Sequence, residues 1–165
     1  MMAEERGFSI RQYTDDDFGA VRTLNGDEQH ESYEGAVFVR QAGVLYGGTF
    51  LCAVCDDVIC GYAIGAPVTG GNVAWVIRLG VLPSHRGRGI GRALMQALEE
   101  RFAALEIREL YLSVHPENLP ARSLYDTLGY MVTEIRSAYF GEGEDRLIMK
   151  KNLDTALSSS LSPCR

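Results

Sequence analysis

The chain has 165 residues, with 16 Lys or Arg and 22 Asp or Glu, so its formal net charge is −6. This balance argues against a nucleic-acid or anionic-membrane binder that works through a basic surface, and 46% hydrophobic residues exclude a disordered chain. No apolar stretch reaches the length of a membrane span, and the first residues lack the apolar segment of a signal peptide. We therefore expect a soluble cytoplasmic protein with a single domain over residues 1–153 and a flexible tail over residues 154–165.

The first half of the chain predicts paired strands and a helix. Alternating residues indicate a strand over 8–12, and three aspartates open a helix over 15–24, because carboxylates suit a first turn. An acidic stretch follows, with a second helix whose ends the sequence leaves open. Strands over 50–55 and 58–65 meet at Asp56-Asp57, which predicts a tight hairpin.

From residue 73 onward the pattern changes to alternating strands and helices. We expect helices over residues 90–105 and 120–128, and strands over residues 73–82, 109–114, 130–140 and 146–153. Apolar residues recur on one face of the first of these helices, and Gly129 suits the left-handed position that ends the second. The order of elements predicts a mixed α+β domain without internal repeats.

The four cysteines are interpreted as structural rather than as metal ligands. Cys52 and Cys55 have C-x-x-C spacing, but they lie in an apolar strand pattern, where residues three apart point to opposite faces. No second cysteine or histidine pair completes a zinc site. Cys60 is expected in the core and Cys164 in the tail, which is consistent with a reducing compartment.

The most informative segment is the turn Arg86-Gly87-Arg88-Gly89-Ile90-Gly91-Arg92, between a predicted strand and a predicted helix. Its alternating glycines let the backbone turn sharply and bring N–H groups close to a ligand. The helix N-terminus adds unpaired N–H groups and the positive end of the helix dipole, and the three arginines add charge. The turn is therefore a candidate pyrophosphate site. A glycine-rich loop with solvated arginines is the alternative interpretation.

Two common phosphate motifs do not fit this turn. A Walker A loop requires Gly-Lys-Ser/Thr, which the chain lacks. The dinucleotide fingerprint G-x-G-x-x-G is not matched by the G-x-G-x-G pattern found here, and the turn does not open an N-terminal βαβ unit. A nucleotide binder that uses the same turn for another phosphate ligand stays open as a further alternative.

The turn does match the pattern Gln/Arg-x-x-Gly-x-Gly/Ala, as Arg86-x-x-Gly89-x-Gly91. This match resembles the acyl-CoA-binding motif of the GNAT superfamily of N-acetyltransferases. A second segment, Asn118-x-x-Ala121-x-x-x-Tyr125-x-x-x-Gly129-Tyr130, is similar to the superfamily pattern N-x-x-A-x-x-x-Y-x-x-x-G-F. The two segments cover about residues 73–130, in the expected order of strands and helices.

The resemblance implies a fold and a co-substrate. The implied fold has a twisted, mostly antiparallel sheet of six to seven strands, with a splayed parallel pair in its middle and helices on both faces. Acetyl-CoA is implied as the acyl donor, with no metal, and the closing strands imply a possible homodimer. The residues implied to contact the donor are Leu79, Val81, Arg86, Gly87, Arg88, Gly89, Ile90, Gly91 and Asn118.

The resemblance also implies direct transfer of the acetyl group to a primary amine. Tyr125 is the implied hydrogen-bond partner of the departing sulfur, although its helix position also fits a core residue. The backbone N–H of Val81 is implied to hold the oxyanion. Many superfamily members have a Glu on the strand before the turn, but residues 73–79 contain no carboxylate. His115 is the candidate base, with a polar loop residue as the alternative, and Ser113 is a candidate to order a water.

The acceptor is inferred from weaker features. Residues 137–149 are similar to the closing hairpin of protein N-terminal acetyltransferases, including the ribosomal-protein alanine type, where the tyrosine matching Tyr139 borders the peptide amino terminus. Glu31 and its acidic neighbours could attract a cationic acceptor, or could be a solvated face. We expect a peptide α-amine, then a small-molecule amine or polyamine. The alternative function is an acyl-CoA-binding module without turnover.

Overall fold

The computed structural model describes residues 7–25 and 32–154. It has a mixed α+β fold, with strands in the order β1-β2-β3-β4-β5-β7-β6 and a parallel pair, β4 and β5. The sequence therefore predicted the fold class correctly. The chain forms two compact units: the first is Met1–Ala66 with Val76–Leu98, and the second is Pro67–Trp75 with Glu99–Arg165. Both β4 and the helix after it contribute residues to each unit.

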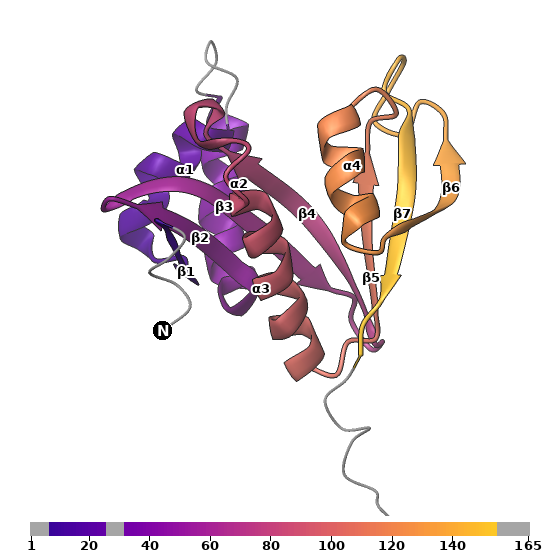
Figure 1. Cartoon of the computed structure of the whole chain (residues 1–165), viewed down its shortest axis with the longest axis horizontal. Coiled ribbons are helices and arrows are strands. Elements are labelled where there is room, and N and C mark those ends of the chain that lie inside the picture. The colour runs from indigo at the N-terminus through magenta and orange to yellow at the C-terminus, as the bar shows by residue number, and fades with distance from the viewer. Residues whose placement is uncertain (1–6, 26–31, 155–165) are drawn as a thin grey trace, which may run out of the picture. The chain divides into compact units, whose positions relative to one another are not determined.

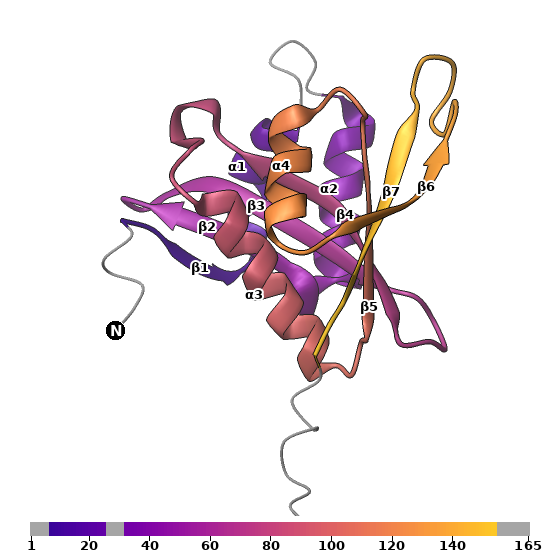
Figure 2. The ribbon, with the colours of Figure 1, turned by 45° about the vertical axis from the view of Figure 1, so that its right-hand side comes forward.

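Figures 1 and 2 trace the elements along the chain. The strands are β1 (Ser9–Gln12), β2 (Phe50–Cys55), β3 (Val58–Pro67), β4 (Val73–Val81), β5 (Glu109–Val114), β6 (Met131–Arg136) and β7 (Arg146–Asn152). The α-helices are α1 (Phe18–Asn25), α2 (Tyr33–Leu45), α3 (Ile90–Ala104) and α4 (Leu119–Thr127). Short 3-10 turns cover Asp15–Asp17, Gly47–Thr49 and Pro83–His85.

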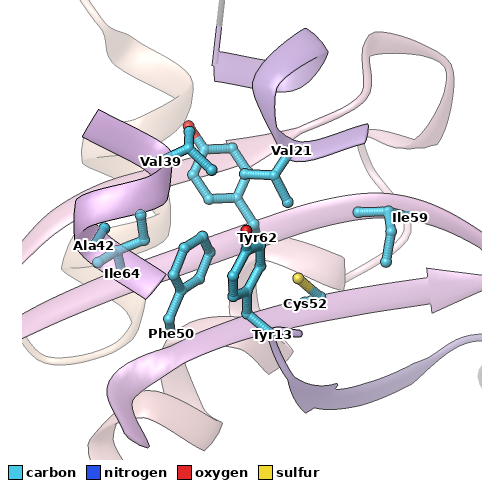
Figure 3. Close-up of a cluster of buried hydrophobic side chains, with 9 residues drawn as sticks. All are labelled: Tyr13, Val21, Val39, Ala42, Phe50, Cys52, Ile59, Tyr62 and Ile64. Atoms are coloured by element: carbon cyan, nitrogen blue, oxygen red, sulfur yellow. The ribbon is translucent and has the colours of Figure 1, made fainter. Parts of the chain in front are cut away.

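Helices cover both faces of the sheet in the first unit. Tyr62 of β3 packs with Val21 of α1 and Val39 of α2 in a buried cluster (Figure 3). The preceding residue, Gly61, points to the other face, where an added Cβ would lie 3.1 Å from Ile90 and 3.2 Å from Leu94 of α3. Successive strand residues alternate between faces, so α1 and α2 lie on one face of β3 and α3 lies on the other.

Helix α2 is the element that the sequence did not delimit. Its residues include two glycines and three valines, which are weak helix formers. Gly43 is needed in this helix because an added Cβ would lie 2.7 Å from the Tyr13 ring. That ring stacks on Phe50 with centroids 4.0 Å apart. Tertiary packing therefore outweighs the low helix propensity of this segment.

The hairpin between β2 and β3 is confirmed. Cys55 pairs with Val58, and the two loop residues Asp56 and Asp57 have φ of 48° and 62°. Two consecutive positive φ values are typical of a type I′ turn, whose twist matches that of the flanking strands. The predicted helix over 15–24 is instead a 3-10 turn followed by α1, because the Asp17 carboxylate caps the turn through the Thr14 backbone N–H at 2.8 Å.

In the second unit, β7 pairs antiparallel with both β5 and β6. Figure 1 shows helix α4 beside β5 in this unit. The predicted strand over 130–140 is too long: β6 ends at Arg136, because the following residues turn. Ala138 has φ of 51°, and its backbone N–H donates to the Asp145 carboxylate at 2.8 Å.

The cysteines in the described part of the chain are buried and free. They are Cys52, Cys55 and Cys60, whereas Cys164 lies outside the described residues. Burial raises the pKa of the Cys52 thiol to about 12, so this thiol is unreactive at neutral pH. Within residues 7–25 and 32–154 there is no group of three metal-ligating side chains, and no helix long and apolar enough to span a membrane.

Candidate active site

The glycine turn follows β4 directly and leads into α3. After β4, the Leu82 N–H donates to the Cys60 carbonyl at 2.8 Å, so the chain stays against β3 up to the 3-10 turn. Gly87 and Gly89 have φ of 75° and 81°, the left-handed region that favours glycine. An added Cβ on either would meet no heavy atom within 4 Å. These glycines therefore serve the backbone path and leave open space beside it.

Helix α3 presents its N-terminus to this open space. The first helical hydrogen bond runs from the Ala93 N–H to the Gly89 carbonyl at 3.0 Å. The N–H groups of Ile90 and Gly91 precede it and have no acceptor within the helix. Arg88 is exposed beside them, and Arg86 is exposed while its Nε donates to the Val81 carbonyl at 3.2 Å. The turn thus has the amide donors and positive charge that a pyrophosphate requires.

The neighbouring part of β4 is shaped by a second glycine. Leu79 and Val81 are half-buried, and Gly80 between them lies against the Tyr62 ring, where a Cβ would be only 2.7 Å from Cε1. The Tyr62 hydroxyl in turn donates to Asn25 Oδ1 at 2.9 Å. This packing fixes the backbone of β4 just before the turn. The sequence-based reasoning missed it because nothing in the local pattern pairs residue 62 with residue 80.

In the second unit, α4 carries the second sequence motif. Asn118 is the N-cap of α4, and its Oδ1 accepts from the Ala121 N–H at 3.2 Å. The side-chain NH₂ of this exposed residue is left for another partner. The motif asparagine therefore has a structural function in the helix, and it can still donate hydrogen bonds to a ligand.

Tyr125 is the buried side chain of α4, with 7% of its surface exposed. Its ring meets the Tyr130 ring edge to face, with centroids 5.9 Å apart. Burial raises the pKa of Tyr125 to about 12. Its hydroxyl makes no hydrogen bond to any residue of 7–25 or 32–154, so it is able to donate to a ligand atom.

The neighbouring Tyr130 has a different function. Its hydroxyl donates to Glu99 at 2.9 Å, and the same carboxylate pairs with Lys151 at 2.7 Å. Burial and the adjacent Glu99 carboxylate raise the pKa of Tyr130, so its hydroxyl stays protonated. This network joins the end of α3 to β7 and holds the ring on which Tyr125 packs.

Ser113 and His115 lie at the end of β5 and just beyond it. Ser113 is half-buried. It lies two residues before His115, and residues two apart along a strand point to the same face. The Glu117 backbone N–H lies 3.2 Å from Nδ1 of His115 and donates to it. In this geometry Nδ1 is the acceptor, so the neutral ring carries its proton on Nε2. The lone pair that would take a proton from a substrate amine is thus engaged by the backbone.

The residues predicted to bind the acceptor are only partly described. Tyr139 follows β6 and is 37% exposed. The guanidinium carbon of Arg136 lies 5.2 Å from the centroid of its ring, and the centroid of the Phe140 ring lies 4.7 Å away. Its ring is therefore available at the hairpin surface. Glu31 lies outside the described residues, and its neighbour Glu34 is exposed in the first turn of α2.

The first unit thus contains a strand that leads through a glycine turn into a helix N-terminus, and the second unit contains a helix with a buried tyrosine. The chain belongs to the acetyltransferase (GNAT) family, whose sequence model matches residues 9–130. It is accordingly an acetyl-CoA-dependent N-acetyltransferase, which transfers acetyl groups to amines. This result confirms the family and the reaction class predicted from the two motifs.

The chain is also similar to individual proteins over almost its whole length. The N-alpha-acetyltransferase of Saccharolobus solfataricus is 27% identical over 159 residues, which cover 90% of this chain and 95% of that protein. The crystal structure of Ard1 from Thermoplasma volcanium matches with a TM-score of 0.80 at 19% identity, covering 90% of this chain and 99% of that one. Arabidopsis thaliana Naa50, in complex with the bisubstrate analogue CoA-Ac-MVNAL, matches with a TM-score of 0.72 at 20% identity, covering 88% and 98%.

Proposed function

We propose that the acceptor is the α-amine of a peptide or protein N-terminus. The observation that carries this proposal is the absence of a carboxylate from residues 73–79, the strand segment before the turn. An α-amine has a pKa near 8, so about one-tenth of it is neutral at pH 7, whereas a lysine near 10.4 is almost wholly protonated. A site without a strong base therefore favours the α-amine. The similarity to an N-alpha-acetyltransferase over 90% of the chain supports the same acceptor.

Acetyl-CoA supplies an activated thioester, and the residues of the chain bind and orient it. We assign the pyrophosphate to the backbone N–H groups of residues 86–91, where the open space beside Gly87 and Gly89 admits it. Backbone groups of Leu79 and Val81 are assigned to the pantetheine arm, and Asn118 donates to the same arm. The Val81 N–H then holds the developing oxyanion as the amine attacks the carbonyl carbon.

Tyr125 is assigned to the departing sulfur. A phenol with a pKa of about 12 and a thiol near 8.5 differ by about 3.5 units, so full proton transfer to the thiolate is unfavourable by about 5 kcal/mol. A hydrogen bond to the sulfur requires no such transfer. Tyr125 therefore acts as a hydrogen-bond donor that stabilises the developing thiolate. The thiolate leaves as the C–S bond breaks, and it then takes up the proton that the attacking nitrogen loses, which gives the amide and free CoA thiol.

His115 is assigned a positioning function rather than that of the base, because its Nδ1 accepts from the Glu117 N–H. His115→Asn keeps an acceptor oxygen in the place of Nδ1 but removes the titratable ring. We expect this variant to retain kcat within about threefold, with an unchanged pH profile, because the acceptor amine reaches the site already neutral. His115→Ala, which removes the acceptor, is the comparison variant.

Steady-state kinetics of both His115 variants between pH 6 and 9 decide the assignment. A loss of kcat by about 100-fold or more in His115→Asn, with the acidic limb of the pH profile abolished, would identify His115 as the general base instead. In that case Ser113 remains the candidate to order a water between His115 and the amine.

Release of free CoA thiol tests the choice of acceptor. We expect turnover with peptides that have a free N-terminus, and kcat/KM that rises with pH and levels off near the α-amine pKa of about 8. Peptides blocked at the N-terminus, free lysine, polyamines and aminoglycosides are the control acceptors. Faster turnover of any control acceptor than of every free peptide would overturn the assignment to an α-amine.

A further inference from the structure

Arg78 of β4 is a cationic side chain that the transfer chemistry does not use. It is exposed, and its guanidinium carbon lies 5.2 Å from the centroid of the Phe38 ring of α2. No carboxylate among residues 7–25 and 32–154 forms an ion pair with it. Stacking on an aromatic ring restrains an arginine while leaving its N–H donors free, so Arg78 is prepared to bind an anion.

The position of Arg78 on β4 places it on one face of the sheet. Gly80, two residues further along, faces the Tyr62 ring, and Phe38 belongs to α2. Arg78 is therefore on the face of the first unit that α1 and α2 cover. Helix α3, whose N-terminus is assigned to the pyrophosphate, packs against Gly61 on the opposite face.

We therefore place acetyl-CoA and the acceptor amine on opposite sides of β4. The donor is anchored on the α3 face, and an amine must approach the thioester carbonyl from the side that the donor leaves free. The acceptor consequently comes from the α1 and α2 face, past Arg78. An extended peptide advances about 3.3 Å per residue, so the side chains nearest to the guanidinium belong to the first few residues after the reacting amine.

We propose that Arg78 selects acceptors with a carboxylate close to the reacting amine, which in a peptide is an Asp or Glu at the second or third position. This inference rests on the proposed function, because it needs a peptide acceptor. A guanidinium binds a carboxylate through two parallel N–H donors, and it disfavours a lysine or arginine at the same place. The recognised feature is thus an acidic N-terminal segment.

Peptides that differ only at the second and third positions test this inference. We expect kcat/KM for Ala-Asp-Asp peptides to exceed that for Ala-Ala-Ala peptides by about fivefold, and Ala-Lys-Lys peptides to be slower still. Arg78→Gln should remove this order by raising KM for the acidic peptides, with little change for the neutral ones. High salt should reduce the wild-type preference in the same way.

Arg40→Gln is the matched control, because Arg40 of α2 also stacks on a phenylalanine, with its guanidinium carbon 3.8 Å from the Phe18 ring centroid. It should keep the preference of the wild type. Equal kcat/KM for all three peptides in the wild type, or an intact preference in folded Arg78→Gln, would overturn the assignment to Arg78 alone. If the enzyme acetylates small amines but none of the peptides, the proposed function is overturned as well. If Arg78→Gln does not fold, the salt dependence of the wild-type preference decides.

Discussion

Replacing Tyr125 by Phe is expected to lower kcat by about 100-fold, with the KM for acetyl-CoA changed by less than about twofold. The hydroxyl has no hydrogen-bond partner among the described residues, so its removal costs little packing and eliminates one proposed donor to the sulfur. The pKa of about 12 keeps the phenol protonated between pH 6 and 9, so the wild-type rate should show no loss from its ionisation there. Steady-state kinetics with saturating peptide measure both effects.

Tyr130→Phe is the matched control, because its ring packs edge to face with Tyr125 but its hydroxyl binds Glu99. This variant should lower stability by about 1–3 kcal/mol, because it leaves part of the Glu99 carboxylate unpaired, and should leave kcat nearly unchanged. An undiminished kcat in folded Tyr125→Phe would remove Tyr125 from the chemistry.

Replacing Gly89 by Ala is expected to raise the KM for acetyl-CoA by about tenfold and to leave kcat at saturation within about threefold. The Cβ meets no protein atom, but it enters the space assigned to the pyrophosphate. The φ of 81° also disfavours an L-residue, so the turn itself shifts. Kinetics with varied acetyl-CoA, or the shift of Tm by free CoA, provide the measurement.

Gly70→Ala separates these two causes. Gly70 has a φ of 77° and an equally open surrounding, but it lies in the loop between β3 and β4. It should lower the free energy of unfolding by about 1 kcal/mol, as Gly89→Ala does, without changing the KM for acetyl-CoA. Equal KM values in the two variants would contradict the assignment of the glycine turn to the pyrophosphate.

Local sequence was sufficient for the elements whose side-chain period or turn chemistry is strong. The apolar strand β2, the strand β5 and the Asp56-Asp57 turn needed no tertiary information, and their expected bounds agree with the structure. Helix α2 was not delimited, because its glycines and valines are chosen for contact with the Tyr13 ring rather than for helix propensity. Packing of this kind is invisible to a local pattern.

The residues of the candidate site likewise fall into two groups: those indicated by a local motif, and those whose contacts are distant in the sequence. The glycine turn and the residues around Tyr125 could be proposed from the sequence, because each motif has fixed spacing within one segment. Arg78 and Tyr62 were missed, because their significance comes from contacts with Phe38 and Gly80, which are distant in the sequence. His115 was named as a base from its type and position, and only its contact with the Glu117 N–H argues for a positioning function.

Acetylation of a peptide α-amine is the reaction that we propose for this chain. Its most direct test is a peptide with one free N-terminus and one internal lysine, incubated with acetyl-CoA and analysed by tandem mass spectrometry together with CoA release. We predict one acetyl group per CoA released, located on the α-amine, with the lysine unmodified. Acetylation of the lysine in preference to the N-terminus, or CoA release without an acetylated peptide, would contradict the account.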